Sequence, residues 1–383
     1  MVTHSIITLY RELVQLCDTN EAFYYNDSVS KGGGKYRSFT YRLASYTDFL
    51  EPSALSCRGT MFEIDDNAEP IRLACRTPLK FFNAYENPMV MFPRDLKCTE
   101  IALAMDKRDG SIISTFMDND TVIRTKSQTS MHSEHAVNST ALIHKDDEMH
   151  HAIIEADGEG YTVNLEYTSP EFRIVLPYQT DELVVLNLRH RETGEYLTGQ
   201  ELKNKFPVLY NKSVFFVHGD IDKTFPMRQT IRESVDAVFG MTDIEGFVVQ
   251  LKDGTMFKIK TDWYCALHFR KDSINVDSRL YEVVLVGASD DLRQMFQTDQ
   301  YCLDKIARME KLVFSTSNHL QADVESFVDK NKHLGRKEFA LQVQQDLSKK
   351  LNRQGLAFAL YNGKKVDYKE VMLKYMRDVL ENF

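Results

Sequence analysis

The sequence lacks the features that mark membrane, secreted and zinc-binding proteins. It has no run of about 18 consecutive apolar residues, so we expect no membrane-spanning helix. Its six cysteines are scattered without a CxxC pair, which argues against a zinc site or a disulfide framework and favours free thiols. No basic segment followed by an apolar core opens the chain. We therefore expect a cytoplasmic protein without a signal peptide.

The chain also lacks an excess of positive charge. Its net charge of −9 excludes a uniformly basic coat for nucleic acid, although a local basic groove stays open. Residues 331–383 are the exception, because they hold 11 lysines and arginines against 6 aspartates and glutamates. This segment carries +5 and the rest of the chain −14. A basic helical end is typical of a solvated surface, and it is also suited to contact a polyanion.

Length and hydrophobic pattern indicate two domains. The 383 residues, 43% of them hydrophobic, exceed what one hydrophobic core usually supports. The pattern changes from short β-rich runs to helical spacing near residue 270. We therefore predict an α+β domain with antiparallel sheets over residues 1–270 and an all-helical domain over 271–383.

The individual elements follow from the same patterns. A helix is expected at 6–17, and strands are expected at 112–116, 161–167, 183–188, 247–251 and 256–260. In the last domain, one helix face is predicted from Phe339, Val343, Leu347 and Leu351, and another from Val371, Tyr375 and Val379. Asp367 and Glu370 have the spacing of a capping box.

A lysine directly before a predicted strand is the first candidate for chemistry. Lys107 is followed by Arg108, Asp109 and Gly110, and then by apolar residues. By itself this pattern is typical of a turn that leads into a strand. It also fits a lysine nucleophile held on a loop. Such a lysine reacts only as the neutral amine, so nearby cations or a metal must lower its pKa.

A predicted hairpin brings further charges together. Asp253-Gly254 is a strong two-residue turn signal between two strands. A loop of these two residues places Val249 opposite Lys258, and it places Glu245, Lys258 and Lys260 on one face. That face is either a solvated surface with ordinary charges or a site for a triphosphate and a metal.

Three more segments carry polar groups next to predicted strands. Glu166 lies near the end of the strand at 161–167. Arg58 precedes a glycine and a strand, and Lys80 stands beside Phe81 and Phe82. Each alone is typical of ordinary surface structure, whereas an arginine and a lysine in one cleft would fit phosphate binding.

Taken in order, these segments resemble the covalent nucleotidyltransferase superfamily of RNA ligases, DNA ligases and mRNA capping enzymes. Within it the sequence is most similar to the phage RNA ligase 1 family, the tRNA-repair ligases. The resemblance extends from the N-terminal helix to at least residue 310. It rests on the segments 39–41, 44–46, 57–59, 80–83, 107–111, 164–166, 173–176, 192–196, 244–246, 257–260, 262–264 and 287–292.

The resemblance implies a three-step reaction with ATP. A lysine takes AMP from ATP, passes it to an RNA 5′-phosphate, and a 3′-hydroxyl then displaces the AMP. It assigns the nucleophile to Lys107 and its loop to Asp109 and Gly110. The remaining catalytic matches are Glu166, Glu245, Lys258 and Lys260.

The resemblance also assigns nucleotide-binding and metal-binding residues. The expected nucleotide contacts are Tyr41, Arg58, Lys80, Phe82, Lys126 and Tyr264, with Lys126 matched only after a one-residue gap. Glu166 and Glu245 suit Mg²⁺, with Mn²⁺ as an alternative. Asp290 and Asp291 resemble an acidic pair linked with a second metal, and they fit equally well as first-turn carboxylates of a helix capped by Ser289.

We therefore expect an ATP-dependent RNA ligase that repairs a cleaved tRNA anticodon loop. Helical spacing after residue 270 disfavours the OB-fold domain of DNA ligases and capping enzymes. The alternatives are another nucleic-acid ligase of the superfamily and a non-catalytic RNA- or nucleotide-binding relative. We expect a monomer in the cytoplasm, the bacterial host's if the protein is phage-encoded. The expected pathway partner is a polynucleotide kinase-phosphatase, because two domains leave no room for end healing.

Overall fold

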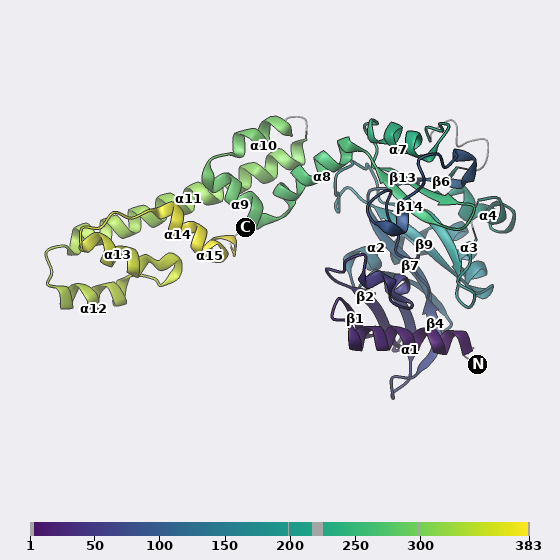
Figure 1. The fold of residues 1–383 in the computed structure, drawn as a ribbon. Helices are drawn as coiled ribbons and strands as arrows, with labels where there is room; N and C mark the ends of the chain where they lie inside the picture. Colours follow the sequence, from purple (N-terminus) through teal and green to yellow (C-terminus); the bar gives the residue numbers. More distant parts are fainter. Residues whose placement is uncertain (1–3, 198, 217–224, 297–298, 382–383) are drawn as a thin grey trace. The chain divides into compact units, whose positions relative to one another are not determined.

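The computed structural model describes residues 4–197, 199–216, 225–296 and 299–381 (Figure 1). The chain divides into two compact units, Met1–Ala266 and Leu267–Phe383. This division falls inside helix α8 (Asp262–Asn275), as does the predicted domain boundary after residue 270. No helix among the described residues is long and apolar enough to cross a membrane.

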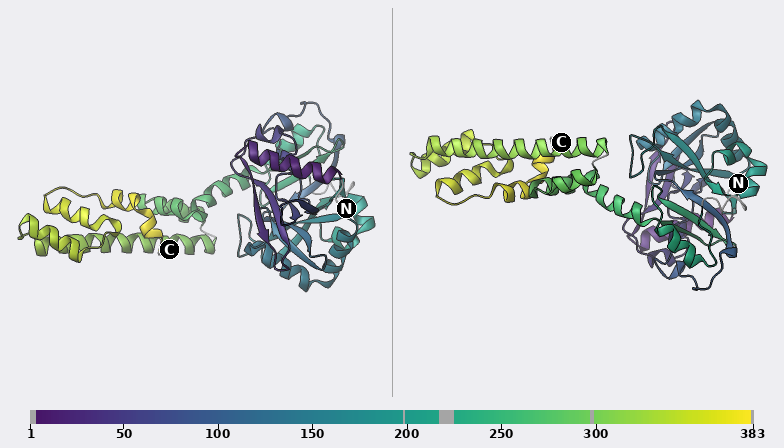
Figure 2. Two further views of the ribbon diagram at one scale, coloured as in Figure 1. Left: turned by 90° about the horizontal axis from the view of Figure 1, so that it is seen from below. Right: turned by 90° about the horizontal axis from the view of Figure 1, so that it is seen from above.

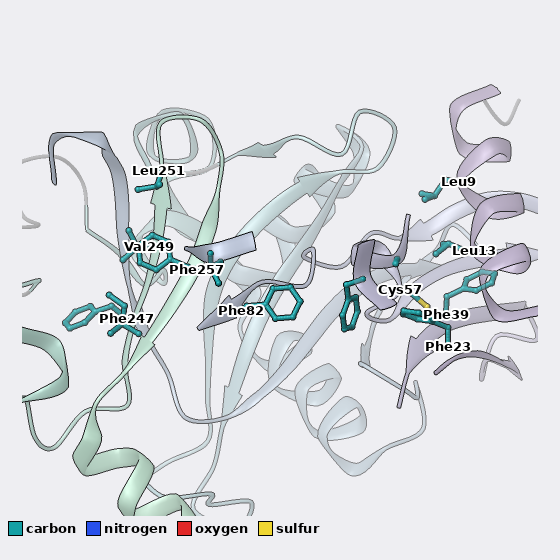
Figure 3. Packing of buried hydrophobic residues seen from close by; sticks show 14 of the residues in the cluster. Leu9, Leu13, Phe23, Phe39, Cys57, Phe82, Phe247, Val249, Leu251 and Phe257 are labelled. Atoms are coloured by element: carbon teal, nitrogen blue, oxygen red, sulfur yellow. The ribbon is translucent and has the colours of Figure 1, made fainter. Parts of the chain in front are cut away.

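The first unit begins with a helix packed on a four-stranded antiparallel sheet. Helix α1 (His4–Thr19) confirms the predicted N-terminal helix, and Figure 2 shows it lying across the strands. The sheet has the order β1-β2-β3-β4, with strands Phe23–Val29, Lys35–Tyr41, Thr60–Ile64 and Pro70–Cys75. Leu9 and Leu13 of the helix are one turn apart and pack against Phe23 and Phe39 of the sheet (Figure 3).

Two five-stranded sheets hold the other described strands of this unit. One has the order β11-β10-β9-β7-β8, with strands Tyr196–Leu197, Glu182–His190, Tyr161–Thr168, Ser111–Asp118 and Val122–Ser127. The other has the order β12-β6-β13-β14-β5, with strands Phe215–Phe216, Ile101–Lys107, Gly246–Leu251, Met256–Lys260 and Phe82–Asn83. Only β14 and β5 pair in parallel among these strands. The five strands predicted in the first domain are thereby confirmed.

Short helices connect and cover these sheets. The α-helices are α2 (Glu134–Lys145), α3 (Asp147–Gly158), α4 (Gly199–Lys205), α5 (Pro207–Asn211) and α7 (Ile231–Phe239). The 3₁₀ turns are η1 (Asp48–Leu50), η2 (Ala54–Ser56), η3 (Pro88–Val90) and η4 (Cys98–Glu100). Phe82 lies in the same core cluster as Phe39 and Phe257, so its ring connects the first sheet with the third (Figure 3).

The register predicted for the β13–β14 hairpin is wrong by one residue. Val249 pairs with Phe257 and Val248 pairs with Lys258. The reason is a three-residue loop: the Leu251 amide donates to the Thr255 carbonyl (2.9 Å), and Gly254 has φ +87°. Lys258 and Lys260 still share a face, because they are two residues apart on one strand.

The second unit is helical throughout its described part. Its further helices are α9 (Asp277–Val286), α10 (Ser289–Met295), α11 (Gln300–Asn331), α12 (Arg336–Asp346), η5 (Lys350–Asn352), α13 (Arg353–Tyr361), α14 (Tyr368–Lys374) and α15 (Met376–Leu380). The long helix α11 contributes Ile306, Met309 and Val324 to the core, and α9, α10, α13, α14 and α15 pack against it.

The predicted helix faces of this unit are only partly correct. Helix α12 ends at Asp346, so Leu347 and Leu351 lie beyond it, and Leu351 has φ +52°. These leucines reach the core because the chain turns after α12, and not because the helix continues. Likewise, Tyr375 separates α14 from α15.

Capping in the same unit also gives a mixed result. Asp367 caps α14, since its Oδ1 accepts from the amides of Lys369 (2.9 Å) and Glu370 (3.2 Å), so its half of the predicted capping box is present while the reciprocal bond from Glu370 is not. The Ser289 cap is wrong, because α10 follows Ala288 without a side-chain cap.

Candidate active site

Lys107 is the last residue of β6, and its ammonium meets a buried carboxylate. Its Nζ lies 2.9 Å from Oε1 of Glu245, and Nζ of Lys260 lies 3.0 Å from the same oxygen. The Glu245 side chain is 2% exposed, whereas those of Lys107 and Lys260 are 21% and 26% exposed. One buried anion therefore holds two partly accessible cations side by side.

Glu245 reaches both lysines because the backbone is irregular at Gly246. In the observed register Gly246 pairs with both Lys260 and Lys107, so Glu245 lies just outside the paired strands. Gly246 has φ +144°, and a Cβ there would lie 1.9 Å from the carbonyl oxygen of Ile259. Only glycine fits this conformation and this close approach. Of the two lysines predicted to lie with Glu245, Lys260 contacts it, whereas its second partner is Lys107 and not Lys258.

The loop after Lys107 is fixed by its buried aspartate. Asp109 Oδ2 accepts hydrogen bonds from the amides of Val175 (2.7 Å) and Leu176 (2.6 Å). Its Oδ1 accepts from the hydroxyl of Tyr264 (2.6 Å). Gly110 packs so closely that a Cβ would lie 2.3 Å from the carbonyl oxygen of Tyr167. Asp109, Gly110 and Tyr264 therefore set the position of the loop.

Glu166 lies opposite Ile112 on one side and Val184 on the other, in the middle of its sheet. Burial raises the pKa of Glu166 to about 7, and the cation of Lys107 opposes this rise while the carboxylate of Glu245 adds to it. Near neutral pH this carboxyl therefore exists in both protonation states. A cation placed beside it would favour the ionised form.

Lys258 shows the corresponding effect for an amine. Burial lowers its pKa to about 7, and the cations of Lys80, Lys107 and Lys260 lower it further. Without a ligand, these cations repel one another, because few carboxylates lie near them. They would be stabilised by a polyanion such as a triphosphate.

Lys107, Glu166 and Lys258 line a cavity of about 230 Å³ between the two five-stranded sheets. Its charged lining comes from Arg58, Lys80, Asp106, Lys107, Arg108, Glu166 and Lys258. Its apolar lining includes Met105, Ile112, Leu186, Val214, Val248 and Met256. A cavity lined by both apolar and cationic side chains is suited to a base joined to phosphates.

Lys80, which lines this cavity, is surrounded by aromatic rings. Its Nζ donates to the hydroxyl of Tyr41 (3.1 Å), and it lies 5.4 Å from the centre of the Phe82 ring. The guanidinium of Arg58 donates to the carbonyl of Leu79 (3.2 Å). Tyr41, Arg58, Lys80 and Phe82 are therefore brought together as predicted. Phe82 itself points into the core, and Phe81 lines the cavity instead.

Lys126 is placed differently from the other predicted nucleotide contacts. It is fully buried outside the cavity lining, and its Nζ donates to the carbonyls of Gly59 (2.7 Å), Ser127 (2.8 Å) and Gln128 (3.3 Å). Burial lowers its pKa to about 8. Its contacts hold the backbone next to Arg58, so a direct phosphate contact is not what this arrangement favours.

The predicted metal ligands are only partly brought together. Asp290 and Asp291 are exposed in the first turn of α10, in the second unit. Across the described residues, no three His, Cys, Asp or Glu side chains are arranged to hold a metal ion. Glu245 Oε2, however, is buried and has no hydrogen-bond partner. Together with Glu166 it fits a divalent cation that takes its other ligands from phosphates and water.

Sequence reasoning missed two residues of the site, one that lines the cavity and one that holds the loop after Lys107. Asn187 lines the cavity, and its amide is oriented by Asn164, whose Nδ2 donates to Asn187 Oδ1 (2.9 Å). Tyr178 accepts from the amide of Asp109 (3.0 Å). An asparagine inside an apolar strand was the available signal for Asn187. No local pattern marked Tyr178.

The chain matches two family profiles and several known proteins. An RNA ligase profile matches residues 56–264, and the profile for the C-terminal domain of T4 RNA ligase 1 matches residues 271–383. A candidate RNA ligase from Thermovibrio ammonificans is 24% identical over 319 residues, which cover 81% of this chain and 78% of that protein.

Solved structures of low sequence identity are similar in part. An archaeal ATP-dependent RNA ligase covers 82% of each chain with 12% identity and a TM-score of 0.46. An RNA ligase of Naegleria gruberi, in a complex with AMP and Mn, has 14% identity and a TM-score of 0.35. It covers 55% of this chain and 64% of its own.

The match over residues 56–264 spans more than half of the chain and includes the whole lysine-lined cavity. The protein is therefore an RNA ligase with the α+β architecture described above. The further match of residues 271–383 places it in a particular group. The chain belongs to the T4 RNA ligase 1 family.

Proposed function

We propose that the protein joins RNA 3′-hydroxyl and 5′-phosphate ends with ATP, through a covalent lysyl-AMP on Lys107. The observation that carries this proposal is the pair of lysines on one buried carboxylate, Lys107 and Lys260 on Glu245, at the edge of the cavity. An RNA ligase needs a lysine nucleophile beside groups that bind the triphosphate, and Lys107 shares its carboxylate partner with the cation of Lys260.

In the first step, Nζ of Lys107 forms a bond to the α-phosphorus of ATP. The bond from that phosphorus to the bridging oxygen breaks, pyrophosphate leaves, and Nζ loses a proton. Lys258 and Lys260, which share a face beside Lys107, are positioned to neutralise the charge that builds up on the α-phosphate. The apolar lining at Val248 and Met256 would receive the base.

Two transfers follow the first. An RNA 5′-phosphate oxygen attacks the lysyl-AMP phosphorus and frees Lys107, so the AMP now caps the RNA end. A 3′-hydroxyl then attacks the RNA phosphorus, which closes the strand and releases AMP. Arg58, Lys80 and Tyr41 are the cationic and hydroxyl groups beside which the RNA phosphate would replace pyrophosphate.

Glu166 and Glu245 would hold Mg²⁺, or Mn²⁺ in its place, and the bound ion would neutralise phosphate charge and favour the neutral amine. The unpartnered Oε2 of Glu245 and the titration of Glu166 near pH 7 both support this assignment. The assignment of a second ion to Asp290 and Asp291 stays a prediction.

The natural substrate that we propose is a tRNA cleaved in its anticodon loop. The match of residues 271–383 to the C-terminal domain of T4 RNA ligase 1 supports it, as does the +5 charge of residues 331–383. A polynucleotide kinase-phosphatase would prepare the broken ends. A nicked anticodon stem-loop should therefore be sealed faster than an unstructured strand of equal length, and equal rates would contradict the tRNA assignment.

Labelled ATP tests the ligase chemistry itself. With Mg²⁺, the wild-type protein should acquire a label that is stable in alkali and is released by acid or by acidic hydroxylamine, as expected for a phosphorus–nitrogen bond, and Lys107→Ala should not. A wild-type protein without label would favour the non-catalytic RNA- or nucleotide-binding alternative. Label on Lys107→Ala would contradict the residue assignment alone.

A further inference from the structure

Residues 42–50 expose three large apolar side chains next to the candidate site. Leu43 is fully exposed, Leu50 is 62% exposed and Tyr46 is 38% exposed. We call this segment the 42–50 platform. Single exposed apolar residues are common, whereas three within nine residues are an unusual concentration of apolar surface.

The platform is attached at both ends to Lys80. It follows Tyr41, whose hydroxyl accepts a hydrogen bond from Lys80 Nζ (3.1 Å). Near its other end, the ring of Phe49 lies 5.7 Å from the same Nζ and 5.0 Å from the ring of Tyr41. Since Lys80 lines the cavity, these contacts place the platform beside a cation of the site.

The platform is held in one conformation. Asp48 Oδ2 accepts hydrogen bonds from the amide (2.7 Å) and hydroxyl (2.8 Å) of Ser45, and Oδ1 accepts from the side chain of Asn20 (3.0 Å). Leu43 adopts φ +50°, a left-handed conformation that is unfavourable for leucine. Leu43 is thus held in an unfavourable backbone conformation with its side chain in water, where it adds nothing to the packing of the protein core.

We propose that the 42–50 platform stacks against the first unpaired base of the 5′-phosphorylated RNA end. This inference rests on the proposed function, in which the RNA phosphate enters beside Lys80 and Arg58. The proposal places the base attached to that phosphate against Tyr46 and Leu43. Every base has an apolar face, so such a platform accepts any sequence. A stable protein interface would need a much larger patch than these three side chains supply.

The experiment uses the double variant Leu43→Asn/Tyr46→Ser. Asparagine tolerates positive φ, so the loop conformation is kept while the apolar surface is removed. Ile71→Thr is the matched control, because Ile71 is 49% exposed on β4, outside the platform. Each enzyme is first loaded with labelled ATP and freed of nucleotide. AMP transfer is then measured with a 5′-phosphorylated RNA whose first nucleotide is either normal or abasic.

We expect all three proteins to form lysyl-AMP at equal rates. Wild type and Ile71→Thr should lose about tenfold in transfer at subsaturating RNA when the first base is missing. The double variant should lose about tenfold with normal RNA and nothing more with abasic RNA. The proposal would be overturned if the double variant transferred AMP to normal RNA at the wild-type rate, or if it still lost about tenfold when the first base is missing.

Failure of the proposed function is distinguishable from failure of the platform. A wild-type protein that forms no lysyl-AMP contradicts the ligase chemistry. In that case, fluorescence anisotropy is used to measure how tightly the same two RNAs bind, which tests the platform without catalysis. An unchanged RNA profile in the double variant, together with loss of a protein partner, would assign residues 42–50 to a protein interface and overturn the proposal.

Discussion

The hydroxyl of Tyr264 donates a 2.6 Å hydrogen bond to Oδ1 of Asp109, across 155 residues of sequence. Tyr264 lies in the first turn of α8, and Asp109 lies in the loop after Lys107. Burial and the nearby carboxylates of Glu245 and Asp109 raise the pKa of Tyr264, so the hydroxyl keeps its proton. The start of α8 therefore holds the nucleophile loop in place.

Tyr264→Phe should slow lysyl-AMP formation without unfolding the protein. The substitution removes one of the hydrogen bonds to the buried Asp109 carboxylate, a loss of about 1.5–3 kcal/mol for a bond to a charged group. The two backbone amides that also bind Asp109 remain. Single-turnover labelling should show at least about a tenfold lower rate. An unchanged rate would mean that the loop does not depend on this bond.

Gly246→Ala should abolish lysyl-AMP formation and lower the melting temperature strongly. The new Cβ would lie 1.9 Å from the Ile259 carbonyl oxygen, so β13 and β14 would have to separate. Gly254→Ala is the control: Gly254 also has positive φ (+87°), but no atom lies within 4 Å of the added Cβ. It should cost only about 1 kcal/mol and keep its activity. Equal losses in both variants would contradict the role given to close packing at Gly246.

Glu166→Gln should raise stability in a pH-dependent way. The folded-state pKa of Glu166 is raised to about 7 from 4.5. The contribution of Glu166 to the free energy of unfolding is therefore fully present below about pH 4.5 and is lost as the pH rises through 7. The variant does not ionise, so its gain over wild type should grow from pH 5 to pH 8, up to about 3 kcal/mol. Denaturant unfolding at several pH values measures this. A constant difference would contradict the burial-raised pKa.

Lys126→Met should mainly reduce the stability of the protein and should affect its activity less. The substitution leaves the carbonyls of Gly59, Ser127 and Gln128 without their donor, at a cost of about 1–3 kcal/mol. Because Gly59 follows Arg58, we expect a higher KM for ATP, whereas the rate at saturating ATP should change little. Thermal unfolding and labelling at varied ATP separate the two effects. A loss confined to the saturated rate would favour a direct phosphate contact by Lys126.

Local pattern predicted the elements well where a strong period or a capping residue was present. The strand at 256–260 is observed with the same bounds, and Asp367 caps its helix. The helix face from Phe339 to Leu351 was predicted too long, because periodicity reports which residues are buried and not whether the chain turns between them. The hairpin register failed for a related reason, since Asp-Gly also fits a three-residue loop.

The sequence by itself determined the residue types, their order, the two-domain pattern and the resemblance from which Lys107, Glu166 and Glu245 were proposed. Only the tertiary structure decided which charges meet. Glu245 contacts Lys107 and Lys260 through the backbone conformation at Gly246, and Asp109 contacts Tyr264 across two distant segments. It also turned Lys126 toward carbonyls and Phe82 into the core. These outcomes depend on close packing between segments far apart in the chain, which no local pattern of residues encodes.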